Sequence, residues 1–159
     1  MAFDAFLKID GIVGESRDAK MSGAIDVLSY SFGVANSPGG PGGGSAGKPD
    51  FTDLSFVVRQ SAATVPLLSA VAAGTHHKTG ELILRSQDAK STADFFSVRL
   101  TDVVVTSLHE AASTGGERPA DELSLAYSTI AWSYRAQNPD GSLGTPVTGG
   151  WDLAQNKKI

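Results

Sequence analysis

The sequence contains no cysteine, no long run of apolar residues and no excess of basic residues. The absence of cysteine excludes disulfides, zinc–thiolate sites and cysteine nucleophiles. No stretch is long and apolar enough to span a bilayer, so we expect no membrane insertion. The net charge of −4 and the pI near 5.2 argue against a broad nucleic-acid interface, because such surfaces are strongly basic.

The N-terminal residues, MAFDAFLKIDG, do not form a basic segment followed by an apolar run. They therefore lack the pattern of a secretory signal peptide. We expect the chain to be cytoplasmic after synthesis and, if it leaves the cell, to be exported without a cleaved signal peptide. The length of 159 residues and the hydrophobic content of 41% fit one globular domain that spans residues 1–159.

The stretch TVPLLSAVAAG, residues 64–74, predicts one short α-helix over about residues 65–73. Thr64 or Val65 takes the N-cap position, and Val65 is favoured because a residue before a proline resists the helical conformation. Gly74 supplies a left-handed C-terminal stop. The expected buried stripe contains Leu67, Leu68, Val71 and Ala72, and it leaves Ser69, Ala70 and Ala73 outside. A helix this short is not stable alone, so we interpret it as a structural brace that lies on a sheet.

Apolar and polar residues alternate with a period of two in about six segments, which predicts strands. These segments cover residues 3–10, 24–34, 53–58, 81–85, 96–108 and 123–134. The stretch His76–Gly80 is interpreted as the turn before the fourth strand. The fold class is therefore mainly β, a small antiparallel β-barrel or sandwich with one short α-helix and a long glycine-rich loop.

The phase of the alternation predicts which side chains are buried in these strands. In the first strand the single buried face is Phe3, Ala5, Leu7 and Ile9. In the second strand the phase slips, which indicates a β-bulge or a strand covered on both faces. In the long fifth strand the expected face is Phe96, Val98, Leu100, Val104 and Leu108, with Asp102 as the exception.

Residues 36–50, NSPGGPGGGSAGKPD, contain six glycines and three prolines. The run matches a phosphate-binding loop, a dinucleotide-binding motif and a nucleophile elbow with Ser45. The residue after Lys48 is Pro49 instead of Ser or Thr, and a strand follows where each motif requires a helix. We interpret the segment as an extended flexible loop that matches these patterns through its composition alone.

Other residues with catalytic or ligand-binding chemistry also have simpler interpretations. His76, His77 and His109 could bind a metal only if the fold brought them together, and surface or turn histidines are the expected alternative. Asp121 and Glu122 form a carboxylate pair, but we expect a solvated turn beside Pro119 and no general acid–base pair.

The late strand contains the residues expected in the core or in an interface: Leu123, Leu125, Tyr127, Ile130, Trp132 and Tyr134. Its three aromatic rings could instead form a platform for a ligand. No catalytic constellation, cofactor site or metal site emerges, so the residues favour a binding or assembly role over an enzyme.

Several segments in this order resemble the Hcp family, the haemolysin-coregulated proteins of the type VI secretion system. The matching segments are FLKIDGIVGES, IDVLSYSFGV, TVPLLSAVAAGTHHKTGELIL, FFSVRLTDVVVTSL, LSLAYSTIAWSY and GWDLAQNKKI. They cover nearly the whole chain. The sequence departs from the family at Phe32-Gly33, where many relatives have Trp-Gly, and in the glycine-rich loop.

The resemblance implies a small β-barrel flanked by a helix, which forms hexameric rings that stack into a hollow tube. In that family the tube lies inside a contractile sheath, is propelled into a target cell and can carry effector proteins, so sheath, tip and effector proteins are the implied partners. The loop then makes contacts between rings, with Asn36, Ser37, Pro38, Lys48 and Asp50 as candidates. Phage tail-tube proteins share this architecture.

The strands independently favour assembly. Val103 and Val105 lie opposite Val104, and this strand has apolar residues on both faces. One small core does not need so many apolar side chains, whereas side-by-side packing of subunits would cover them. Three alternatives stay open: a monomeric β-sandwich that binds a small ligand or sugar, a hydrolase that uses Ser45, and a tube protein of a related contractile apparatus.

Overall fold

The computed structural model describes residues 2–37, 47–87 and 93–159. These residues form one helix, α1 (Thr64–Ala73), and eleven strands. The strands are β1 (Phe3–Ile9), β2 (Ile25–Ser31), β3 (Val34–Ala35), β4 (Asp50–Phe51), β5 (Leu54–Arg59), β6 (His76–Ser86), β7 (Asp94–Ala111), β8 (Ala120–Ala126), β9 (Thr129–Tyr134), β10 (Val147–Asp152) and β11 (Lys157–Lys158).

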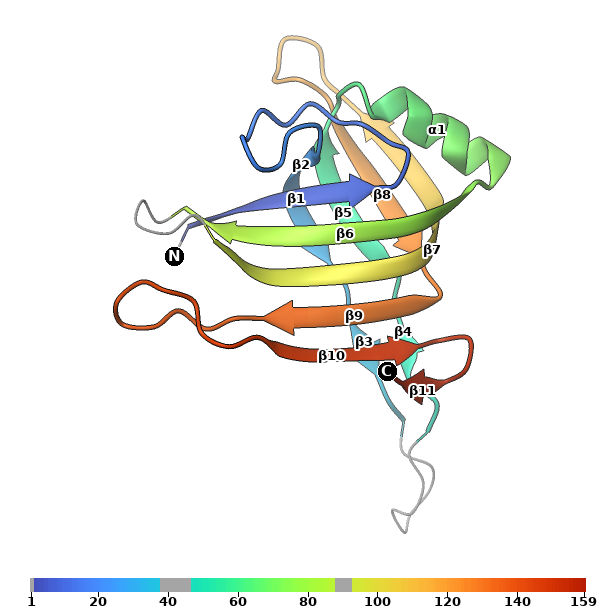
Figure 1. The fold of residues 1–159 in the computed structure, drawn as a ribbon. Helices are drawn as coiled ribbons and strands as arrows, with labels where there is room; N and C mark the ends of the chain where they lie inside the picture. Colours follow the sequence, from blue (N-terminus) through green and yellow to red (C-terminus); the bar gives the residue numbers. More distant parts are fainter. Residues whose placement is uncertain (1, 38–46, 88–92) are drawn as a thin grey trace.

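Six strands close into an antiparallel barrel in the order β7-β6-β1-β2-β5-β8, because β8 pairs with β7 as well as with β5. Strands β9, β10 and β11 extend the sheet outward from β7, and β3 and β4 form a separate hairpin. Figure 1 shows two crossing layers, with β1, β6, β9 and β10 in front and β2, β5 and β8 behind. The predicted fold class, mainly β with one short helix, is confirmed.

The core lies between these two layers. Leu7 pairs with Leu82, and Leu82 pairs with Val98, so one row of fully buried side chains crosses three strands. On the outer side of the barrel, Phe6 packs in a second cluster with Met21, Ala24 and Ile83. The prediction that β1 has a single buried face is therefore wrong, because the segment after β1 folds back over Phe6.

The backbone of β7 changes its direction at Asp102, which has a φ of 52°. This left-handed conformation is uncommon outside glycine, and it shifts the alternation of the strand. Val103 and Val105 are therefore the buried residues beyond the kink, at 0% and 1% exposure. The prediction that Val104 and Leu108 continue the face of Leu100 is wrong for this reason.

The predicted bulge in β2 is confirmed, since its register with β5 shifts between Val27 and Ser29. Two boundaries differ from the prediction. Residues from His76 onward belong to β6 instead of a turn, because His76 and His77 pair with the bent part of β7. The second strand ends at Ser31, and the chain continues into the β3–β4 hairpin, which includes Asp50 from the predicted loop.

Helix α1 begins at Thr64, with Ala63 at the N-cap and no capping side chain. The predicted cap at Val65 or Thr64 is wrong because the Thr64 hydroxyl is used elsewhere. It accepts a hydrogen bond from the Ser61 N–H and donates one of 2.6 Å to Asp121 Oδ2. The prediction for Gly74 is confirmed, since it ends the helix with a φ of 62°.

This contact also sets the rotation of the helix on the barrel. The buried helical residues are Thr64, Leu67 and Ala70. Leu68, predicted on the buried stripe, is 44% exposed, and Ala70, predicted outside, is 4% exposed. Both faces have helical spacing, and the hydrogen bond to Asp121 selects the face that contains Thr64.

Asp121 is completely buried on β8, so the predicted solvated turn is wrong. Its neighbour Glu122 is exposed, because successive residues of a strand face opposite sides. Among the described residues, no hydrogen-bond partner reaches the buried Oδ1 atom of Asp121. The carboxylate thus anchors the helix to the barrel through its other oxygen.

Arg85 fastens the segment between β1 and β2 to the outside of the barrel. Its guanidinium is almost fully buried and donates hydrogen bonds of 2.7 Å to Asp18 and 2.9 Å to Asp94. It also lies over the ring of Phe6, 5.7 Å from the ring centroid. The backbone N–H groups of Lys20 and Met21 and the charge of Arg85 lower the pKa of Asp18.

Substitution of Leu67 tests the observed rotation of the helix. Leu67→Ala should lower the free energy of unfolding by about 2–5 kcal/mol, because it leaves a cavity at a fully buried site. Ser69→Ala, on the exposed face, serves as the control and should change it by less than about 0.5 kcal/mol. Urea titration followed by circular dichroism measures both values. Equal effects of the two variants would contradict the described packing.

Substitution of Asp18 tests the Arg85 cluster. Because the folded state lowers the pKa of Asp18, its carboxylate stabilises the fold above the pKa of the unfolded chain, about 3.9. That stabilisation is lost as the pH falls through the folded pKa. Asp18→Asn should therefore lower the Tm near neutral pH, and the difference from the parent should shrink in acid.

Asp10→Asn is the matched control, because Asp10 is exposed and its carboxylate accepts no hydrogen bond from the described residues. Thermal unfolding at a series of pH values compares the three proteins. A Tm difference for Asp18→Asn that stays constant from neutral to acid pH would refute the role given to its charge.

Candidate assembly surfaces

Outward side chains of β2, β5, β8 and the second half of β7 form a hydroxyl-rich face. One cross-strand row on this face consists of Ser31, Ser55, Ser124 and Ser107. The Ser124 hydroxyl lies 2.6 Å from that of Ser107 and 2.7 Å from that of Thr106. A shallow depression of about 350 Å³ follows the row. The face is polar and contains few charges, so it suits contact with water or with polar protein surfaces.

The β3–β4 hairpin leads away from the barrel and is called the arm below (Figure 1). Val34 pairs with Phe51, and the Asn36 side chain donates a 2.8 Å hydrogen bond to the Gly47 carbonyl. A Cβ atom on Gly47 would lie 2.3 Å from the Ser37 carbonyl oxygen, so the two chains approach closely here. The predicted loop 36–50 therefore begins and ends as a paired hairpin.

The candidates for contacts between rings lie on or beside the arm. Asn36, Ser37, Lys48 and Asp50 are exposed at its described end. Pro38 and the candidate nucleophile Ser45 lie outside the described residues. The structure thus places four of the five candidates together on one projection.

Aromatic side chains hold the root of the arm. Phe51 stacks on Trp132, with ring centroids 6.2 Å apart and an interplanar angle of 18°. The Tyr127 hydroxyl donates a 2.9 Å hydrogen bond to the Thr52 carbonyl, and burial raises the pKa of Tyr127 to about 12. The root of the arm therefore packs against the sheet that contains β9.

The other residues of the late strands divide between core and surface. Leu123, Leu125 and Ile130 are buried in the main core. Tyr134 is 49% exposed at the far end of β9. Because Tyr127 and Trp132 contact the arm root and Tyr134 does not, these three rings do not form one platform for a ligand.

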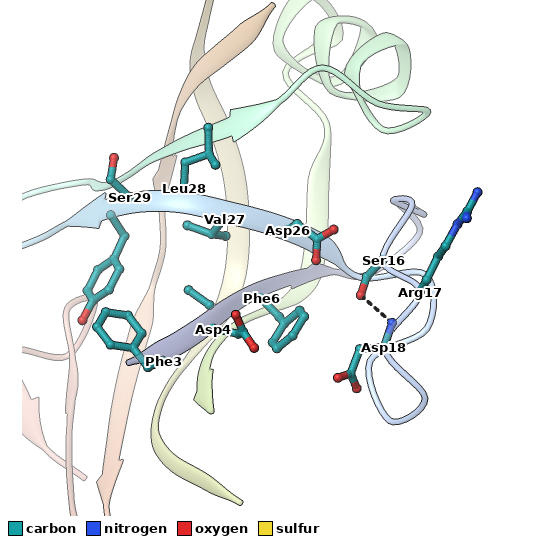
Figure 2. Close-up of a pocket in the computed structure, with 12 residues that line it drawn as sticks. Phe3, Asp4, Phe6, Ser16, Arg17, Asp18, Asp26, Val27, Leu28 and Ser29 are labelled. Atoms are coloured by element: carbon teal, nitrogen blue, oxygen red, sulfur yellow. Dashed lines mark hydrogen bonds between the residues drawn. The ribbon is translucent and has the colours of Figure 1, made fainter. Parts of the chain in front are cut away.

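A groove of about 600 Å³ lies on the outside of β1 and β2. Its floor includes Phe6 and Asp26, which pair across the two strands, and its wall includes residues 16–18 (Figure 2). Phe3 and Leu28 line it as well, and they are 47% and 51% exposed. We call it the β1–β2 groove. Its residues come from three separate segments, so no local pattern in the sequence predicts it.

Acidic side chains give this groove a negative charge. Asp4, Asp18 and Asp26 all line it, together with one base, Arg17. Asp18 is neutralised by Arg85, and Asp4 accepts a hydrogen bond from Gln87. Among the described residues, Asp26 makes no ion pair or side-chain hydrogen bond. The groove thus combines exposed apolar side chains with an unpaired carboxylate.

Helix α1 presents an uncharged apolar surface on the side away from the core. Val65 is 69% exposed and Leu68 is 44% exposed, and no residue of the helix carries a charge. Basic side chains follow directly after its C-terminus, at His76, His77 and Lys78. This outer helix face is another surface on which apolar side chains lie in solvent.

The histidines do not converge on a site. His76 Nδ1 lies 2.8 Å from Asp102 Oδ1, and His77 Nδ1 lies 2.9 Å from the Asp10 carbonyl, whereas His109 lies on the hydroxyl-rich face. The hydrogen bond from His76, with one from a serine hydroxyl, lowers the pKa of Asp102. Within the described ranges, no group of three or more His, Cys, Asp or Glu residues could hold a metal ion. The same ranges include no helix with the length and hydropathy needed to cross a membrane.

Comparisons with known proteins relate this chain to proteins of a secretion apparatus. A family profile described as "Type VI secretion system effector, Hcp" matches residues 6–134. Protein hcp1 of Pseudomonas aeruginosa is 33% identical over 159 residues, which covers 98% of each chain.

Solved structures agree with this match over the whole fold. The structure of a type six secretion system protein superposes with a TM-score of 0.93 at 32% identity, over 99% of this chain and 100% of the other. Hcp1 from Salmonella typhimurium superposes with a TM-score of 0.81 at 29% identity, over 100% of both chains. A type VI secretion system effector from Yersinia pestis has a TM-score of 0.78 at 28% identity and covers 94% of this chain and 99% of its own.

Proposed function

Because the chain belongs to the Hcp family of type VI secretion system proteins, we propose that it is the tube subunit of such a system. In this role six copies form a ring, and rings stack into a hollow tube that carries effector proteins. The observation that carries the proposal is the extent of the likeness. It extends over 99% of this chain and 100% of the solved type six secretion system protein, with a TM-score of 0.93.

The surface of the subunit supports assembly. Large apolar side chains are exposed at both ends of the barrel, among them Phe3, Leu28, Val65 and Leu68. A lone soluble domain gains nothing from such exposure, whereas contacts between subunits remove these side chains from water. Sheath, tip and effector proteins are the further partners in this proposal, and export proceeds without a cleaved signal peptide.

The arm provides the contact between stacked rings in this proposal. It projects away from the barrel, and its root is fixed by the stacking of Phe51 on Trp132. A fixed root holds the exposed residues Asn36, Ser37, Lys48 and Asp50 on the projecting arm. In the sequence, the segment between the two strands of the arm is rich in glycine and proline.

The oligomeric state tests the proposed function directly. Gel filtration coupled to light scattering at micromolar concentration should give about six times the subunit mass of 16.4 kDa. Negative-stain microscopy of the same fractions should show rings. A clean monomer mass would overturn the tube role and favour a monomeric ligand-binding sandwich.

Two variants test the arm. Replacing Pro38–Lys48 with a short Gly-Ser linker should leave the ring mass unchanged, because β2 and β5 keep their registers. Tube formation and secretion should fall. The second variant replaces the same residues with a Gly-Ser segment of the native length. It keeps the length of the arm but removes its native side chains, so the pair of variants separates the effect of length from that of the side chains.

The arm would be a tolerated insertion if the shortened protein stacked and secreted at the parental level. Normal stacking of the native-length Gly-Ser variant, with loss in the shortened one, would assign the effect to length. Loss in both variants is the expected outcome, because both lack Lys48, which supplies a charged contact in this proposal.

A further inference from the structure

The strand pairing changes register where the barrel meets the arm. Ser31 pairs with Ser55 at the end of the barrel, and Val34 pairs with Phe51 at the start of the arm. One chain has two residues between these pairs and the other has three. An extra residue on one of two paired strands bends them, as it does in a β-bulge. The arm therefore turns away from the barrel at this junction (Figure 1).

The strands of the arm do not fix its direction by themselves. In the described part of the chain they pair only at Val34–Phe51 and Ala35–Asp50, and a two-stranded ribbon of this size is marginally stable in water. A short ribbon joined through a bend swings about that bend unless other contacts hold it. Contacts from the junction to the rest of the subunit must therefore set the direction of the arm.

The junction makes such contacts at three consecutive residues. We propose that Phe51, Thr52 and Asp53 act as a three-point clamp, which holds the arm in one direction before it meets a partner. The clamp lies within one subunit and does not depend on ring formation. Its consequence for stacking rests on the proposed tube function.

Thr52 is the centre of the clamp, because all of its polar groups form hydrogen bonds. Its N–H donates to the Gly33 carbonyl at 3.0 Å, and its hydroxyl accepts from the Gly33 N–H at 2.8 Å and donates to the Gly33 carbonyl at 3.2 Å. The Thr52 carbonyl accepts from the Tyr127 hydroxyl. Burial and, next, the charge of Asp53 raise the pKa of Tyr127 to about 12, so this donor keeps its proton at neutral pH. Thr52 thus ties the two chains of the junction to each other and to the end of β8.

Asp53 provides a contact on the other side of the junction. Its Oδ2 accepts a 2.8 Å hydrogen bond from the hydroxyl of Thr106, which lies at the register shift between Val105 and Ser107 in β7. The same hydroxyl lies 2.7 Å from that of Ser124. Because a carboxylate only accepts, Thr106 gives its proton to Asp53 and accepts from Ser124. The bulge in β7 therefore places a hydroxyl where it joins the arm root to the barrel wall.

The clamp reaches three different elements of the subunit: Trp132 on β9, Tyr127 directly after β8, and Thr106 on β7. A ribbon held at one point can still rotate about it, whereas three contacts in different places fix both its tilt and its rotation. The stacking of Phe51 on Trp132 adds an apolar contact to the two polar ones. In the proposed tube, an arm positioned in advance loses less freedom when it meets the next ring.

Hydrogen exchange of the intact protein, followed by mass spectrometry, tests the clamp. Tyr127→Phe and Thr106→Val each remove one hydroxyl that contacts Thr52 or Asp53 and does not contact Gly33. Each should make exchange of the Gly33 amide about 3- to 10-fold faster, as expected for the loss of one hydrogen bond that holds the junction closed. An unchanged rate at Gly33 in both variants would overturn the clamp.

Two matched substitutions serve as controls for the exchange measurement. Tyr134→Phe removes a tyrosine hydroxyl away from the arm root, and Thr114→Val removes a hydroxyl in the exposed turn between β7 and β8. Neither should change the rate at Gly33. An acceleration by the controls equal to that of Tyr127→Phe and Thr106→Val would show a general loosening of the fold and would contradict the proposal.

The direction of the arm is measured with a dye on the hairpin. The chain has no cysteine, so Ala35→Cys on β3 accepts a single label, and Lys8→Cys on β1 gives the tumbling of the barrel. Time-resolved anisotropy should be alike at the two sites in the parent. Thr52→Val should add a fast nanosecond component at position 35 only, and Thr52→Ser, which keeps the hydroxyl, should remove most of it. The same fast component in the parent and in Thr52→Val would overturn the clamp.

The clamp and the tube role fail in different ways. A monomer mass for the parent would overturn the tube role, and the exchange and anisotropy results would still decide on the clamp because its contacts lie within one subunit. Rings that stack normally in Thr52→Val, in spite of a loosened arm, would overturn the consequence for stacking. Reduced stacking in Thr52→Val that Thr52→Ser restores is the expected result.

Discussion

The architecture depends on one strand that pairs in both layers. The first half of β7 pairs with β6 and β9, and its second half pairs with β8, so this strand alone closes the barrel and starts the outer extension. The change of layer occurs at Asp102, where the left-handed backbone reverses the alternation of buried residues. His76 and Ser128 hold the Asp102 carboxylate from two sides and so stabilise this conformation. Without the kink, Val103 would not point into the core, and β7 would not join the two layers on its side of the barrel.

Closure of the barrel also determines which surfaces of the subunit are left for contacts with other subunits. Backbone hydrogen bonds are satisfied around the barrel, so edge pairing is not available there as a means of assembly. Apolar side chains are exposed on the helix, in the groove and at further positions such as Val13 and Val147, and a hairpin extends outward. In the proposed tube, the subunits would therefore associate through side chains around the ring and through the arm between rings. The buried hydrogen bond between Thr64 and Asp121 positions the helix, and the ion pair of the buried Arg85 with Asp18 positions the groove wall.

Much of the fold follows from local patterns in the sequence. The strands have a period of two, Gly74 ends the helix, and the phase slip in β2 marks a real bulge. These features depend on neighbours in sequence, so the sequence predicts them. Asp102 also interrupts the apolar pattern of its strand, but the pattern does not reveal that the phase changes beyond it. Only the positive φ explains why Val103 replaces Val104 in the core.

The remaining errors concern contacts between distant residues. The face of α1 is ambiguous because two stripes have helical spacing, and the choice depends on Asp121, which lies 57 positions from Thr64. Phe6 is buried by a segment that folds back over it, which alternation alone does not predict. The groove joins residues from β1, the following segment and β2. The resemblance predicts the family, but these long-range contacts determine which side chains of this chain form its surfaces.

The position of the arm has a mechanical consequence. The arm continues β2 and β5, with only two residues between each barrel strand and its hairpin strand. Tension on the arm therefore pulls both barrel strands along their own length. Each of them is also paired on its other side, β2 with β1 and β5 with β8. Such a load shears a whole ladder of hydrogen bonds at once, whereas a sideways pull would open them one after another. If the arm joins stacked rings as proposed, a pull on it acts along the direction in which the subunit resists extension best.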